Sequence, residues 1–136
     1  MRTVVLDNEA VQALVDADHP KHRAVIAHLA GVVTRRRRGP AVDVVVPTAV
    51  RVEAGWDRSE RSAAPANRLR VRDEDLGTQS ANLAARIRIA SGVSVADAHA
   101  GALMRSLTSD DIVVLTSDPE DMERASAPRR ITAVRI

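Results

Sequence analysis

Residues 3–17, TVVLDNEAVQALVDA, decide the fold class of this chain. The first five form a short, apolar, β-branched run, which predicts a buried strand. The next ten predict a helix whose apolar side chains lie along one side, namely Ala10, Val11, Leu14 and Val15. A strand that runs directly into a helix is typical of α/β proteins, in which the two elements alternate along the chain.

The same alternation continues to the end of the sequence. Buried strands are expected at residues 42–46 (VDVVV), 112–116 (IVVLT) and 131–136 (ITAVRI), with a short edge strand at 69–71 (LRV). Helices are expected at residues 21–34, from Thr48 as N-cap, at 76–91, at 95–108 and after Pro119. The run RRRRGP at 35–40 is a loop signal. The sequence therefore predicts one α/β domain over residues 1–136 with a mostly parallel sheet.

The composition narrows the class of protein further. Trp56 is the sole aromatic residue, so the core must be aliphatic, and the 45% of hydrophobic residues suffices to build one. The absence of cysteine excludes disulfides and thiolate metal sites and fits a reducing cytoplasm. No apolar run is long enough to cross a membrane. The strand-like start leaves no room for a signal peptide, so we expect a cytoplasmic protein.

Four acidic residues lie where an apolar strand ends or a helix begins: Asp7, Glu53, Asp97 and Asp118. In parallel sheets the chemistry gathers at the carboxyl ends of the strands. Asp7 and Asp118 follow the two most apolar strands, which should be central neighbours. Carboxylates that converge there would repel one another without a cation. The pattern therefore predicts a site for a hard divalent ion such as Mg²⁺.

Each of these residues also has a structural explanation. Asp7 and Asp118 fit helix N-caps, and Asp97 fits the third helical position of a capping box that begins at Ser94. Helical spacing places Glu53 with Val52 and Trp56 on an apolar side, where a carboxylate is costly unless it is paired or bound to metal. An arginine such as Arg51 or Arg86 is the structural alternative for Glu53. Among the histidines, His19 and His22 are spaced to suit a metal or to lie solvated at a helix start, and His99 is expected to be structural.

The lysine content excludes two rival readings of the first aspartate. Phosphoaspartate receivers and haloacid-dehalogenase phosphatases also place an Asp after the first strand, but both need a lysine late in the chain. The only lysine here is Lys21. The chain also has no glycine-rich phosphate loop, which argues against nucleotide hydrolysis of the P-loop kind.

Five segments, taken in their order along the chain, resemble the PIN-domain nucleases, in particular VapC-type toxins of bacterial toxin–antitoxin pairs. These segments are VVLDNEAVQALV, DHPKHRAVIAHL, VPTAVRVEAGW, VADAHAGALM and VLTSDPEDM. The resemblance implies a three-layer α/β/α fold and a Mg²⁺-dependent endoribonuclease, with Mn²⁺ as a substitute. It assigns metal-binding and catalytic roles to Asp7, Glu53, Asp97 and Asp118. Thr116 and Asp121 would lie just behind the metal ligands. The alternative role for Asp121 is that of a helix cap. The sequence departs from the family at Asn8, Glu9 and Met122.

The resemblance also implies partners, and it leaves two alternatives open. The expected partners are an RNA substrate, a small antitoxin protein and a second copy of the chain. One alternative is a catalytically inactive PIN-like module that binds RNA or serves as a scaffold. The other is a structure-specific DNA nuclease of the same fold, which usually carries extra helical insertions. The Arg35–Arg38 run could guide an RNA backbone or be a solvated helix end.

Overall fold

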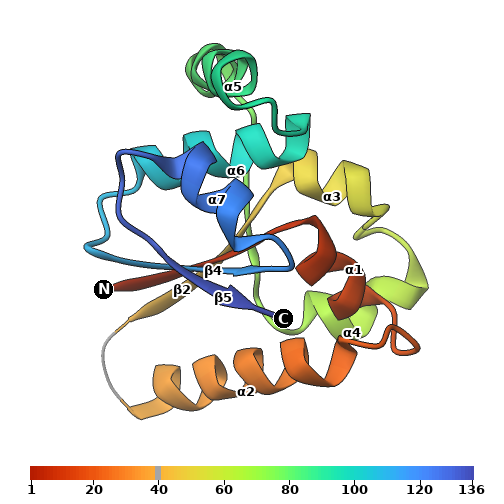
Figure 1. Ribbon diagram of the computed structural model, residues 1–136. Helices are drawn as coiled ribbons and strands as arrows, with labels where there is room; N and C mark the ends of the chain where they lie inside the picture. Colours follow the sequence, from red (N-terminus) through yellow and green to blue (C-terminus); the bar gives the residue numbers. More distant parts are fainter. Residues whose placement is uncertain (39–40) are drawn as a thin grey trace.

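The structure is a computed structural model that describes residues 1–38 and 41–136, without the side chains of residues 33 and 35–38. Its centre is one sheet (Figure 1). The strand order in this sheet is β3-β2-β1-β4-β5. The strands are β1 (Arg2–Leu6), β2 (Val42–Pro47), β3 (Arg72–Glu74), β4 (Asp111–Thr116) and β5 (Thr132–Arg135). All four neighbouring pairs are parallel, so the predicted parallel sheet is confirmed.

The strand order creates a switch point beside β1. The chain runs outward from β1 to β2 and β3, then crosses to the other side of β1 to form β4 and β5. Val5 of β1 therefore pairs with Val45 on one side and with Val114 on the other. Where the order reverses, the loops at the carboxyl ends of the strands part and leave a crevice. β1 and β4 are central neighbours, as the sequence predicts for the strands that precede Asp7 and Asp118.

Helices cover both faces of the sheet (Figure 1). They are α1 (Asn8–Val15), α2 (His22–Arg38), α3 (Thr48–Ala54), α4 (Ala64–Asn67), α5 (Thr78–Ser91), α6 (Val95–Ser106) and α7 (Pro119–Ser126), with a 3₁₀ turn at Arg61–Ala63. On one face the aliphatic core joins the sheet to α1, α2 and α4. On the other face it joins the sheet to α6 and α7. The three-layer α/β/α architecture is thus confirmed, with α5 packed on the outer side of α6 and α7.

Several predicted element boundaries are wrong. The edge strand is Arg72–Glu74 rather than 69–71, because Val71 is buried in the core before pairing begins. The helix after it starts at Thr78, so Leu76 precedes the helix, and Ala90 lies on its exposed side. Thr48 is the first residue of α3 rather than its cap, and its hydroxyl accepts a hydrogen bond from the backbone N–H of Leu76 at 3.3 Å.

The helix predicted to stop at residue 34 continues through the arginine run to Arg38. Arginine is a good helix former, and positive charge is favourable at a helix C-terminus. The run ends just before β2 begins, at the amino-terminal edge of the sheet. Among the described residues, no helix is long and apolar enough to cross a membrane.

Candidate active site

An acidic hollow of about 210 Å³ opens at the switch point, at the carboxyl ends of β1 and β4. Its lining residues are Asp7, Asn8, Glu9, Glu53, Ser94, Asp97, Thr116, Ser117, Asp118, Asp121 and Met122. All four acidic residues that the sequence singled out therefore face one space, although more than a hundred positions separate the first from the last. The parallel sheet brings them together because every strand ends at the same edge.

Asp7 is the most deeply placed of these carboxylates, with 5% of its surface exposed. It follows β1 and caps α1, accepting a hydrogen bond from the backbone N–H of Ala10 at 2.8 Å. Burial raises the pKa of Asp7 above its ordinary value, and hydrogen bonds from the Thr116 hydroxyl and the backbone of Ala10 and Ser117 offset only part of that rise. The predicted cap is confirmed, and the same side chain lines the acidic hollow.

Asp97 lies in the first turn of α6, at the third position of the helix. Its backbone N–H donates to the Ser94 hydroxyl at 3.1 Å, which confirms the predicted capping role of Ser94. Desolvation and the negative charges of Asp7, Asp121 and Glu53 raise the pKa of Asp97 to about 6. The acidic hollow therefore holds more negative charge than its own side chains neutralise.

The β4–α7 junction supplies the remaining side of the hollow. Thr116 ends β4 fully buried, and its hydroxyl accepts from the backbone N–H of Asp118 at 2.9 Å. Asp118 caps α7 by accepting from the backbone N–H of Asp121 at 3.1 Å. Asp121 is therefore not the cap; it lines the hollow and is ion-paired with Arg124.

The predicted position of Glu53 on a core-facing stripe is wrong. α3 buries Val50 in the core and leaves both Val52 and Glu53 exposed, at 82% for Val52. The short α3 packs on the core along a narrower strip than the sequence suggests. Glu53 nevertheless lines the acidic hollow, so its exposure leaves its carboxylate free to serve there.

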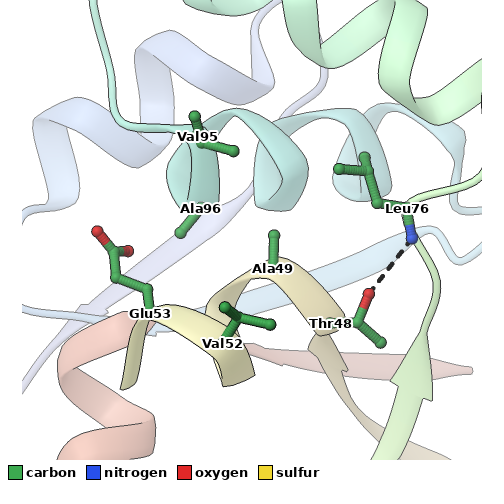
Figure 2. Close-up of a pocket in the computed structure, with 7 residues that line it drawn as sticks. All are labelled: Thr48, Ala49, Val52, Glu53, Leu76, Val95 and Ala96. Carbon is green, nitrogen blue, oxygen red and sulfur yellow. Dashed lines mark hydrogen bonds between the residues drawn. The ribbon is translucent and has the colours of Figure 1, made fainter. Parts of the chain in front are cut away.

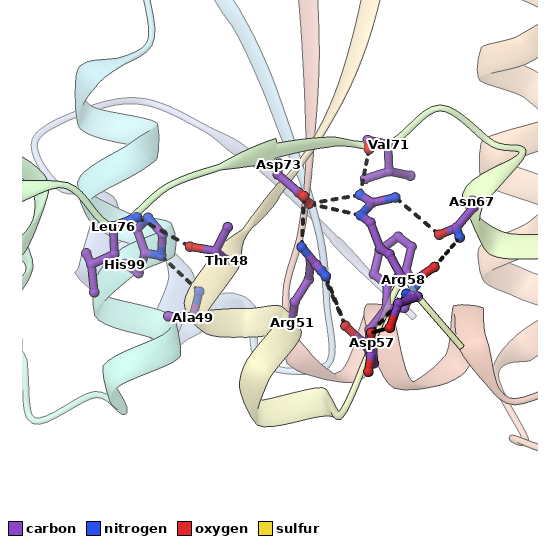
Figure 3. A network of polar contacts seen from close by, with 12 residues as sticks. Thr48, Ala49, Arg51, Asp57, Arg58, Asn67, Val71, Asp73, Leu76 and His99 are labelled. Carbon is purple, nitrogen blue, oxygen red and sulfur yellow. Dashed lines mark hydrogen bonds and ion pairs between the residues drawn. The ribbon is translucent and has the colours of Figure 1, made fainter. Parts of the chain in front are cut away.

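Arg51, the suggested structural partner of Glu53, is bound elsewhere (Figure 3). Its guanidinium donates to Asp73 at 2.8 Å, and Arg58 donates to the other oxygen of Asp73 at 2.9 Å. Arg58 also stacks over the Trp56 ring at 4.1 Å. This network ties the C-terminal end of α3 to β3 and fixes the helix that carries Glu53.

His99 holds the other end of α3 (Figure 3). Its ring is buried, and Nδ1 accepts a hydrogen bond from the backbone N–H of Ala49 at 3.3 Å. Burial lowers the pKa of His99, which favours the neutral ring that can accept this bond. The expected structural role is confirmed.

Two side chains near the start of α2 contact the extra carboxylate Glu9. His19 lies 3.3 Å and Lys21 3.5 Å from the same oxygen of Glu9. His22 binds the backbone carbonyl oxygen of Ala13 through Nδ1 at 2.7 Å. His22 begins α2 as predicted, but both rings are hydrogen-bonded and partly buried, so the prediction that they are solvated is wrong. Neither residue lines the acidic hollow.

The donor set of the hollow fits a hard divalent cation in its chemistry, since all its ionisable ligands are carboxylates. Among the described residues, no three acidic or histidine side chains are grouped closely enough to hold one ion as they stand. For one ion to be held by several of these carboxylates, their side chains would have to come closer together than they stand. Burial is the main cause of the raised pKa of Asp97, and repulsion from neighbouring carboxylates adds to it, so a cation in the hollow would relieve that second contribution.

An apolar groove of about 420 Å³ adjoins the acidic hollow between α3 and α6 (Figure 2). It is lined by Thr48, Ala49, Val52, Glu53, Leu76, Val95 and Ala96. Val95 is 56% exposed and Leu76 37% exposed, which is unusual for large aliphatic side chains that lie together. Glu53 lines both spaces, so the apolar groove and the acidic hollow adjoin at this residue.

The sequence matches no known protein-family profile and no curated protein. In structure it is similar to a chain in the crystal structure of VapBC2 from Rickettsia felis bound to a DNA fragment from their promoter. The alignment covers 98% of each chain with a TM-score of 0.58 and 10% sequence identity. The fold is PIN-like. At this identity the likeness shows the fold alone, and the activity is a separate question.

The hollow also contains residues for which the sequence predicts no functional role. Ser117 lines it between Thr116 and Asp118, so its neighbours could have indicated it. Ser94 lines it as well as capping α6. The guanidinium of Arg135 bonds to the backbone carbonyl of Ser117, and no sequence signal could have placed it there.

The pKa of Asp97 predicts how its replacement changes stability. A carboxyl whose folded-state pKa is raised destabilises the fold once ionised, so the penalty is absent below pH 4 and complete above pH 6. Asp97→Asn removes the charge, and we expect the melting temperature to rise at pH 7.5 without divalent cations. Because solvent screens the half-buried Asp97, the expected gain is about 2–5 °C. Differential scanning calorimetry should show this gain disappear near pH 4; an equal gain at both pH values would contradict the assignment.

Proposed function

We propose that this protein is a Mg²⁺- or Mn²⁺-dependent endoribonuclease and the toxin component of a toxin–antitoxin pair. One observation carries the proposal: Asp7, Glu53, Asp97 and Asp118 line one hollow at the switch point of a PIN-like fold. The VapBC2 neighbour supports the toxin–antitoxin part through its fold.

Asp7 and Asp97 would hold the ion, and Glu53 and Asp118 would complete its site directly or through water. When bound, the ion lowers the pKa of water and stabilises the charge that develops on a phosphodiester. Thr116 and the N–H of Ala10 orient the Asp7 carboxylate, and the Ser94 cap fixes the first turn of α6 that carries Asp97. No side chain of the hollow is needed as a covalent nucleophile.

The apolar groove supports a small antitoxin as partner. A partner helix could place apolar side chains against Val52, Leu76 and Val95 and bring a basic group toward Glu53. Such a contact would inhibit the enzyme, because it would occupy the approach to the acidic hollow. A homodimer remains a prediction from the family resemblance.

The substrate class is testable against the DNA-nuclease alternative. In the described chain the β1–α1 and β4–α7 connections at the hollow are tight and carry no helical insertion that could thread DNA. We expect folded RNA to be cleaved in Mg²⁺ or Mn²⁺ while a flapped DNA duplex remains intact under the same conditions. Gel analysis of both labelled substrates decides this; preferential cleavage of the flap would favour the DNA nuclease.

The inactive-module alternative predicts something different. A module that binds RNA or serves as a scaffold needs no ion in the hollow, whereas a nuclease must bind one. Calorimetric titration with Mn²⁺ separates the two: heat of binding that Asp97→Asn abolishes supports the enzyme, and its absence from the wild type supports the module.

A further inference from the structure

A guanidinium with no carboxylate partner lies at the edge of the acidic hollow. Arg135 is exposed near the end of β5, and its Nη1 donates to the backbone carbonyl oxygen of Ser117 at 3.2 Å. Ser117 is one of the residues that line the hollow, so this bond holds the guanidinium next to the hollow's lining, although Arg135 does not itself line it. Within the described part of the chain, no carboxylate lies within ion-pair distance of Arg135.

The sheet register accounts for this position. Thr116, at the end of β4, pairs with Arg135 of β5. The backbone N–H of the following Ile136 also donates to the carbonyl oxygen of Thr116 at 3.0 Å. β5 thus delivers Arg135 to the same edge of the sheet as Asp7 and Asp118, on the side of β4 away from Glu53.

Other cations near the hollow are already neutralised. Lys21 is paired with Glu9, and Arg124 is paired with Asp121. Both of these carboxylates line the hollow, so the two pairs add little net positive charge. The Arg35–Arg38 run belongs to the end of α2, at the opposite edge of the sheet. Arg135, in contrast to Lys21 and Arg124, is bonded to a residue of the hollow's lining without being paired to one of its carboxylates.

A polyanionic substrate has an electrostatic difficulty at this site. The carboxylates that would hold the ion repel every phosphate that the ion does not contact, so the flanking phosphates need positive charge from elsewhere. Arginine suits this task, because its planar guanidinium donates two parallel hydrogen bonds to phosphate oxygens. The hydrogen bond to Ser117 uses only one of its five N–H groups.

We propose that Arg135 is a positioning residue that binds an RNA phosphate next to the scissile one. The inference rests on the proposed ribonuclease function and adds a direction to it: the RNA strand leaves the acidic hollow over the carboxyl end of β5. Arg135 contacts no reacting atom, so it contributes to KM and to salt dependence rather than to kcat.

The test compares Arg135→Gln with Arg135→Lys and Arg130→Gln. Arg130 is an exposed arginine just before β5, at the amino-terminal edge of the sheet, and serves as the matched control. Binding of a labelled single-stranded RNA is measured across a salt series in the Asp97→Asn background, so that no substrate is consumed. Steady-state cleavage is measured separately without Asp97→Asn, and circular dichroism verifies folding of every variant.

Loss of one phosphate contact flattens the slope of log K against log salt by ~0.7, which corresponds to ~4-fold weaker binding at roughly 0.15 M salt. For Arg135→Gln we expect this weaker binding, a similar rise in KM and an unchanged kcat. Arg135→Lys should recover most of the lost affinity, and Arg130→Gln should bind like the parent protein. Equal binding and salt slopes for Arg135→Gln and Arg130→Gln would overturn the inference. The proposed function fails by a separate result, namely no RNA cleavage by the wild type in Mg²⁺ or Mn²⁺.

Discussion

Asp97→Asn is expected to lower metal-dependent RNA cleavage by at least ~100-fold while the protein stays folded. Replacing residues that merely support metal ligands typically costs 10–100-fold, so loss of a direct ligand should cost at least the upper part of that range. The substitution also removes the charge that repels Asp7 and Glu53, so stability rises. Activity falls because the proposed metal ligand is lost. Single-turnover cleavage of a labelled RNA in saturating Mg²⁺ measures the effect.

Asp110→Asn is the matched control for this prediction. Asp110 is an exposed aspartate just before β4, at the amino-terminal edge of the sheet, far from the acidic hollow. Its variant should cleave RNA at the wild-type rate. Undiminished cleavage by Asp97→Asn would show that the hollow is not the catalytic site.

Gly101→Ala is expected to lower the melting temperature by about 5–10 °C, which for a domain of this size corresponds to roughly 2 kcal/mol. Gly101 lies in α6 against α7, where an added Cβ would meet the carbonyl oxygen of Ala125 at 2.5 Å and its carbonyl carbon at 2.8 Å. The backbone of α7 must then move, and the hydrogen bond from Arg105 to that carbonyl oxygen is strained. This cost exceeds the ~1 kcal/mol that alanine gains over glycine in a helix.

Gly31→Ala provides the comparison at another helical glycine. Gly31 lies in α2, and an added Cβ would have no atom within 4 Å. The helix-propensity gain therefore acts alone, and thermal denaturation should show a melting temperature that is unchanged or a few degrees higher. Equal stabilisation by both substitutions would show that α6 and α7 are not in close contact.

The sequence predicts the buried strands well because their signal is local. The runs that become β1, β2 and β4 are continuous and β-branched, as expected for strands covered on both faces. The edge strand β3 has the sequence RDE, whose charged side chains carry no strand signal. It forms because Asp43 of β2 pairs with Arg72 and because Arg51 and Arg58 bind Asp73, which are contacts between distant parts of the chain.

The sequence predicts which acidic residues line the candidate site, but not how each of them is placed there. Asp7, Asp97 and Asp118 follow strands or begin helices, and those local positions bring them to the edge where the strands end. For Glu53 the apolar periodicity of residues 49–56 misleads, because Val52 belongs to an exposed groove rather than to the core. Arg135 could not be predicted, because its position depends on the register between β4 and β5.

The most direct test of the central claim is the rate of RNA cleavage by the purified wild-type protein as Mg²⁺ or Mn²⁺ is added and then removed with excess chelator. Under the proposed function, the four carboxylates around the hollow would need a cation before a phosphodiester could approach. We therefore expect cleavage that rises with the ion, stops in chelator and returns when the ion is restored. Cleavage that continues undiminished in excess chelator would contradict the account.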